Sequence, residues 1–299
     1  MDDDKKACIT DNPLFSVGRD HKYDDQDGNN KDGGEFDPYQ FPVSAEEAPL
    51  HARYPYVLGS YRSGGSYRDN LWSLFNLHTE TVNCWTMILA CIGSTFGTVF
   101  ASVTTLDVMA IPVFVVFTST TVLHLPFSVG YHLFTSMRRP VFNRWRKMDV
   151  IAIFNVSVLL TFSLSYFVLP WWGCLANTLV AACVACAATV SFARTPDEVD
   201  LDPGKQSLFV GSIVVCYWFP MVFATVRDSL DGKFTLSSCS TVGVLVGLGL
   251  SGWAYSTAWP QRYFPGLFDV WGHSHQLMHV GVLVCHALEF AFLWDNWRR

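Results

Sequence analysis

Residues 150–193 read VIAIFNVSVLLTFSLSYFVLPWWGCLANTLVAACVACAATVSFA and contain no Asp, Glu, Lys or Arg. About 20 apolar helical residues cross the hydrocarbon core of a bilayer, so this stretch is too long for one crossing. Near its middle, Leu169-Pro170-Trp171-Trp172-Gly173 combines a helix breaker with aromatic residues of the kind found at membrane interfaces. The stretch therefore predicts two membrane-spanning helices.

Five further stretches are long and apolar enough to be spans. They are 81–105, 107–137, 206–226, 234–261 and 270–288, the second of which begins at Asp107. Only 15% of all residues are charged, whereas an ordinary soluble domain carries about a quarter. The sequence thus excludes a plain soluble globule and predicts an all-α, polytopic membrane protein with a bundle of seven transmembrane helices.

Basic residues in the short loops predict the orientation of the bundle. They concentrate after the second, fourth and sixth spans, and few follow the spans of opposite parity. The first group comprises Arg138, Arg139, Arg144, Arg146, Lys147, Arg194, Lys205 and Arg262. By the positive-inside rule, these loops and the amino terminus are cytoplasmic.

Three regions follow from composition. Residues 1–47 hold 13 acidic and 5 basic residues and are rich in Asp, Asn and Gly, which predicts a disordered acidic cytoplasmic tail open to a cytosolic partner. Residues 48–79 form a juxtamembrane segment in which Asn70 could cap a short interfacial helix, or an ordinary packed loop. Residues 80–299 form the seven-transmembrane domain.

Five polar side chains inside or beside the spans fall at one predicted depth. Ser128 and His132 lie one turn apart on one face of the second span, and Asp149 follows the basic residues that open the third. His275 and His279 are spaced i, i+4 in the seventh span. Polar residues are costly in hydrocarbon and tend to be functional there, so we expect these five to meet near the cytosolic leaflet.

Three neutral imidazoles with an open fourth position form a common catalytic zinc set. From the residues alone, a buried polar packing network accounts for the same pattern equally well. His124 and His286 lie about two turns away from this level, and we interpret them as helix-packing residues.

Three spaced motifs resemble the progestin and adipoQ receptor family of the haemolysin III superfamily, which is similar in architecture to alkaline ceramidases. They are the S-x-x-x-H of Ser128–His132, then Asp149, then the S-H-Q-x-x-H of Ser274–His279. Upstream, Tyr61-Arg62 and Ser73-Leu-Phe-Asn-Leu-His-Thr-Glu80-Thr-Val-Asn83 also match, so the resemblance covers about residues 54–290. One departure is Met87, where relatives commonly carry a histidine that is not a zinc ligand.

The resemblance implies roles for the residues that match. His132, His275 and His279 would bind zinc, and Ser128 and Asp149 would hold a water at the fourth position. Members of the family are receptors for adiponectin-type proteins or progestin-type steroids, and those like the adiponectin receptors are thought to hydrolyse ceramide to sphingosine and a fatty acid.

Two functions follow as hypotheses. In the first, the protein is a zinc-dependent lipid amidase, with Asp149 deprotonating an activated water and Ser128 stabilising the oxyanion. In the second, it is a non-enzymatic hormone or steroid receptor, or a membrane scaffold, in which the zinc is structural. Structural zinc sites usually have four protein ligands, so a three-histidine set favours the first hypothesis unless Asp149 also ligates.

Other membrane classes fit less well. A cytoplasmic amino terminus and the lack of D-R-Y and N-P-x-x-Y sequences disfavour a rhodopsin-type receptor, and no inverted repeat indicates a transporter. We expect a ceramide-like membrane lipid or a hormone as ligand, and no nucleic-acid partner. Plasma membrane, Golgi and endoplasmic reticulum are equally compatible with the sequence.

Overall fold

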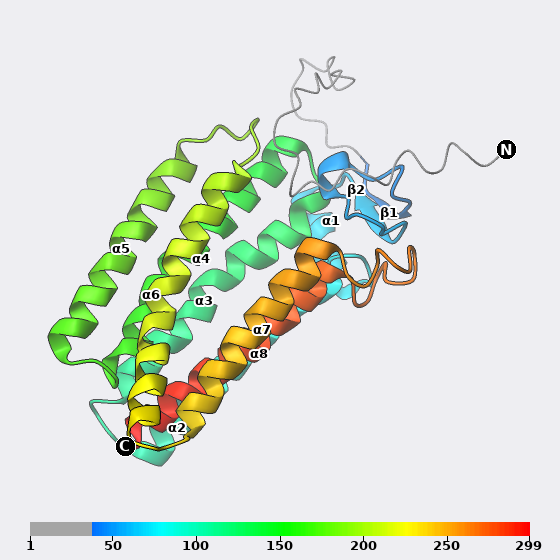
Figure 1. Cartoon of the computed structure of the whole chain (residues 1–299). Coiled ribbons are helices and arrows are strands. Elements are labelled where there is room, and N and C mark those ends of the chain that lie inside the picture. Colours follow the sequence, from blue (N-terminus) through cyan, green and yellow to red (C-terminus); the bar gives the residue numbers. More distant parts are fainter. Residues whose placement is uncertain (1–37) are drawn as a thin grey trace.

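Seven long helices form the body of the protein in a computed structural model that describes residues 38–299 (Figure 1). They are α2 Thr81–Thr105, α3 Ile111–Leu133, α4 Arg139–Tyr166, α5 Trp171–Ala193, α6 Pro203–Leu230, α7 Leu236–Thr257 and α8 Ser274–Trp297. All seven are long and apolar enough to cross a membrane. The predicted seven-helix membrane bundle is confirmed, whereas its orientation stays a prediction. Most of the predicted disordered tail, 1–47, lies outside the described residues.

A small folded segment covers one end of the bundle, beside the amino end of α8 and the carboxyl end of α3 (Figure 1). It contains the antiparallel strands β1 (Gln40–Val43) and β2 (Tyr61–Ser63), followed by the short helix α1 (Tyr67–Trp72). The sequence analysis did not predict the two strands, because each is too short to show an alternating pattern.

Helix α1 begins at a capping box. Ser66 Oγ accepts a hydrogen bond from the backbone N–H of Asp69, and the Asp69 carboxylate accepts one from the backbone N–H of Ser66. Asn70 lies inside the helix with its side chain buried, so the prediction that Asn70 caps it is wrong. The reciprocal pair satisfies two amide groups at the helix start, which a single Asn cannot do. The neighbouring Trp72 and Phe75 are exposed, in keeping with the interfacial position that we expect for this segment.

The third and seventh spans begin at other residues than the charge pattern suggested. Helix α4 begins at Arg139, so the basic residues up to Lys147 lie on its first turns and Asp149 lies ten residues into the helix. Helix α8 begins at Ser274, after Gly272 has taken a positive φ of 85°, and it continues past Glu289 to Trp297. Charged residues enter these helices because side-chain partners satisfy them.

Glycines allow the helices around the candidate site to pack closely. A Cβ at Gly130 of α3 would lie 2.2 Å from the Trp145 ring of α4, and one at Gly247 of α7 would lie 2.8 Å from Cys285 Sγ of α8. Trp145 also packs on Phe134, with ring centroids 4.8 Å apart. Small residues at such crossings let the backbones approach, as is common between transmembrane helices.

We predict that Gly130→Ala lowers stability by about 1–3 kcal/mol, because the added methyl group overpacks the α3–α4 crossing against a rigid indole ring. Thermal unfolding of the detergent-solubilised protein measures the effect. Gly249→Ala is the matched control, because no heavy atom lies within 4 Å of a Cβ built there. Equal unfolding temperatures for the two variants would contradict the packing described for α3 and α4.

Candidate metal centre

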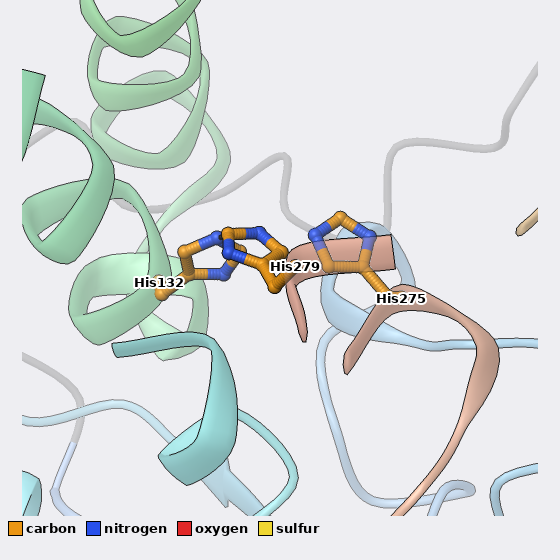
Figure 2. Close-up of side chains that lie close together, drawn as sticks. All are labelled: His132, His275 and His279. Carbon is orange, nitrogen blue, oxygen red and sulfur yellow. Dashed lines mark hydrogen bonds between the residues drawn. The ribbon is translucent and has the colours of Figure 1, made fainter. Parts of the chain in front are cut away.

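Three histidines from two helices meet at the end of the bundle that the 38–79 segment covers. His132 lies in the last turn of α3, and His275 and His279 lie in the first two turns of α8 (Figure 2). One ring nitrogen from each lies within 4.8 Å of the others, and His132 Nε2 is 3.1 Å from His279 Nε2. His132 and His275 are buried, and His279 is partly buried. The structure thus brings together the three histidines that the sequence singled out.

The arrangement fits a metal ion with three imidazole ligands. Zinc–nitrogen distances of about 2.0–2.1 Å in a tetrahedral site place two ligand nitrogens roughly 3.3 Å apart, close to the separation between His132 and His279. His275 Nδ1 is buried without a hydrogen-bond partner among the described residues. The other ring nitrogen of His275 is the one that faces the His132 and His279 rings (Figure 2), so the case for a metal rests on the three converging imidazoles and not on this unpaired atom.

A buried arginine fixes the end of α3 that carries His132. The Arg62 guanidinium donates to the carbonyl oxygens of His132 at 2.8 Å and of Leu133 at 2.9 Å, and to Ser73 Oγ at 2.5 Å. These carbonyls belong to the last turn of α3, where no intrahelical donor remains. The positive charge also complements the negative end of the helix dipole.

A buried carboxylate orients the His132 ring. His132 Nδ1 lies 2.8 Å from Glu80 Oε2, and Asn83 Nδ2 donates to the same oxygen at 2.7 Å. With Nδ1 held by Glu80, Nε2 points toward His279. A carboxylate behind a ligating histidine is the usual way in which proteins fix the ring and raise its basicity. The sequence analysis gave Glu80 no role, although a carboxylate directly before an apolar span was the available signal.

His78 supports Glu80 from the backbone side. The Glu80 amide N–H donates to His78 Nδ1, and His78 Nε2 donates to the Ser73 carbonyl, each at 3.0 Å. Burial, together with repulsion from Arg62, lowers the pKa of His78 to about 3. The ring is therefore neutral at pH 7, and one nitrogen can accept while the other donates.

The start of α8 is tied to the start of α2. His273 Nε2 and Gln276 Nε2 both lie 2.9 Å from the Thr79 carbonyl oxygen, so the turn that carries His275 is held next to Glu80. The Tyr54 ring packs against the His275 ring with centroids 5.3 Å apart. Residues of the 38–79 segment thus form one wall of the site.

Comparison with known proteins identifies the family. A family model described as haemolysin-III related matches residues 75–290. The chain belongs to this family. Similar relatives are an adiponectin receptor protein of Drosophila melanogaster, 26% identical over 75% of this chain, and an ADIPOR-like receptor of Saccharomyces cerevisiae, 28% identical over 77%. A membrane progestin receptor beta of Sus scrofa is 23% identical over 81%.

The alignments cover different shares of these haemolysin III relatives. The aligned region is 52% of the Drosophila protein, 77% of the yeast protein and 72% of the pig protein, so the chain spans about half the length of the first. The resemblance to the progestin and adipoQ receptors is thereby confirmed. The chain is an integral, multi-pass membrane protein of a receptor-type family.

The two other predicted site residues of this haemolysin III family member lie deeper in the bundle. Ser128 is buried on α3, one turn before His132. Asp149 Oδ1 lies 2.8 Å from Nε2 of His124, which the sequence analysis interpreted as a packing residue. His286 bonds Glu289 and stacks on Phe117, which agrees with the packing role expected for it.

We predict that Glu80→Gln weakens zinc binding by about 10- to 100-fold, because the neutral amide orients His132 less firmly and lowers its basicity. Competition with a chelator, followed by metal analysis of the purified protein, measures the affinity. Glu289→Gln is the matched control, since Glu289 is also buried and bonded to a histidine outside the three-histidine cluster. Unchanged zinc affinity in Glu80→Gln would remove Glu80 from the site.

Proposed function

We propose that this receptor-type membrane protein binds zinc through His132, His275 and His279 and hydrolyses ceramide-like lipid amides to a sphingoid base and a fatty acid. The observation that carries the proposal is the convergence of one ring nitrogen from each of three imidazoles within 4.8 Å. Three histidine ligands leave one coordination position for water or substrate, as catalytic zinc sites do. When bound, zinc would lower the pKa of a coordinated water toward about 7 and polarise a carbonyl group.

The roles proposed for the protein's own residues follow from their chemistry. Asp149 accepts a proton from the attacking water and later returns it to the leaving amine. Ser128 donates its hydroxyl hydrogen to the oxygen that becomes negative when the amide carbonyl is attacked. Ser128 lies on the same helix as His132, and Asp149 lies on α4, which packs against that helix at Gly130.

A lipid amide suits a site placed within membrane-spanning helices. The predicted orientation puts the histidines near the cytosolic leaflet, where a ceramide-like molecule can enter laterally between helices. The substrate's hydrocarbon chains then stay among apolar side chains while its amide group reaches the polar cluster. The surrounding helices are apolar over at least 18 residues each, which is the environment such chains require.

A second candidate is a hormone or steroid receptor in which zinc is structural. Burial of His132 and His275 and the ties of the α8 start to Thr79 support this candidate, because a metal there would staple the ends of α3 and α8. The names of the relatives, which are adiponectin and progestin receptors, point the same way. The two candidates share the metal and differ in turnover.

We predict that His275→Ala or His279→Ala lowers the zinc affinity of the purified protein by at least about tenfold, because each removes one of three ligands. Metal analysis after dialysis against a weak chelator reports the loss. His286→Ala, which alters a membrane histidine outside the cluster, should keep its zinc. Full zinc occupancy in both ligand variants would overturn the assignment of the metal site.

We predict that the purified, zinc-loaded protein releases sphingosine from ceramides of several chain lengths, and that Asp149→Ala reduces the rate by about 10²- to 10⁴-fold, the usual contribution of a general base. Sphingosine is quantified by mass spectrometry, and zinc content is measured on the same samples. If the wild-type protein retains zinc but releases no more sphingosine than Asp149→Ala from any ceramide, the result favours a receptor without turnover.

A further inference from the structure

The contact between His124 and Asp149 joins two helices inside the membrane-spanning region. His124 Nε2 of α3 lies 2.8 Å from Asp149 Oδ1 of α4, and the two side chains keep 16% and 12% of their surface exposed. Both residues lie within helices that are long and apolar enough to cross a membrane. A polar side chain without a partner is costly in such surroundings, so the contact with the imidazole stabilises the Asp149 side chain in this position.

His124 belongs to the same helical face as the proposed chemistry. It precedes Ser128 by four residues and His132 by eight, so the three side chains follow one another along α3 at about 6 Å per step. Eight residues of helix separate His124 from His132, so the His124–Asp149 pair lies about 12 Å further along α3 from the three-histidine cluster, on the side of Ser128.

A second histidine–carboxylate pair shows what a packing contact looks like here. His286 Nδ1 lies 2.9 Å from Glu289 Oε2, but both residues belong to α8 and are three positions apart. The Phe117 ring stacks on His286 at a centroid distance of 4.5 Å. The His124–Asp149 pair differs because it bridges α3 and α4 and includes the residue proposed as the base.

We propose that His124 is a positioning residue for Asp149 in the amide hydrolysis, an inference that rests on the proposed function. The His124 N–H donates to Oδ1, which fixes the orientation of the carboxylate and leaves Oδ2 for the attacking water. A carboxylate that accepts such a bond has lone pairs left for a second partner. His124 itself gains no net proton during turnover.

Asp149 accepts one proton during the reaction and later returns it. The water oxygen forms a bond to the amide carbon while one of its O–H bonds breaks and the proton moves to Asp149. When the carbon–nitrogen bond breaks, that proton moves to the leaving nitrogen, which departs as the sphingoid amine. The fatty acid keeps the water oxygen. His124 holds the carboxylate in one orientation through both transfers, as the third group does behind many catalytic bases.

The test compares three substitutions of His124 in the full-length, zinc-loaded protein. His124→Phe removes the donor. In His124→Asn the amide nitrogen takes the position of the histidine Nδ1, so the side chain is too short to reach Asp149. His124→Gln can bring an N–H to the position of Nε2. His286→Phe is the matched control, because it removes a membrane histidine that bonds a carboxylate but lies outside the three-histidine cluster. Each variant is assayed for zinc content, for thermal unfolding, and for kcat and KM with ceramide.

We expect His124→Phe and His124→Asn to keep their zinc and their KM while kcat falls on the order of 10- to 100-fold, the range typical of groups that orient a metal-site residue. His124→Gln should recover most of the rate, and His286→Phe should not change it. Infrared spectra of zinc-free protein give a readout independent of activity. The carboxylate band that disappears in Asp149→Asn should shift in His124→Phe and return in His124→Gln.

Several outcomes would overturn the inference while leaving the proposed function intact. The first is an active wild type whose kcat is unchanged in His124→Phe and His124→Asn. The second is a kcat of His124→Gln that is no higher than that of these two variants. The third is loss of zinc from the His124 variants. A wild type that binds zinc but releases no sphingosine would overturn the proposed function itself, and the positioning role with it.

Discussion

Polar groups inside a bilayer must find their partners within the protein, and this constraint organises the whole structure. Hydrocarbon offers no water to an unpaired carbonyl, guanidinium or carboxylate. The described spans accordingly pair their ionisable residues: His124 with Asp149, His132 with Glu80, and His286 with Glu289. These contacts also hold neighbouring helices and rings in place, so polar pairing and helix packing depend on each other.

The three-histidine cluster exists because three helix ends meet under the 38–79 segment. Arg62 of that segment donates a hydrogen bond to a carbonyl oxygen at the end of α3. The Thr79 carbonyl oxygen contacts His273 Nε2 and Gln276 Nε2 at the start of α8. Helix ends bring unsatisfied backbone groups, which is why a buried guanidinium and side-chain amides gather there. Without the 38–79 segment, these backbone groups at the helix ends would lack hydrogen-bond partners. The two strands and α1 are therefore part of the site.

The sequence predicted what depends on local composition. Seven spans follow from apolar stretches, and the three histidines follow from spacing and from agreement in depth across separate spans. The sequence did not predict features that depend on a partner residue distant along the chain, such as the start of a helix or a contact between two helices. The start of α4 at Arg139 depends on basic side chains that pair with the 194–200 loop, as Arg144 and Lys147 do with Asp197. The contact between His124 and Asp149 likewise needs the register of two helices, which no single stretch encodes.

If zinc occupies the proposed site, charge balance accounts for the carboxylates that lie near the histidines. A divalent ion on three neutral imidazoles would carry two positive charges into a medium of low dielectric, where isolated charge is costly. Glu80 bonds a proposed ligand directly, and Asp149 lies deeper on the neighbouring helix α4. Two carboxylates match the two charges, so a loaded site would be close to neutral. In the proposed site, three histidine rings would bind the ion, while a fourth histidine, His124, contacts the Asp149 carboxylate.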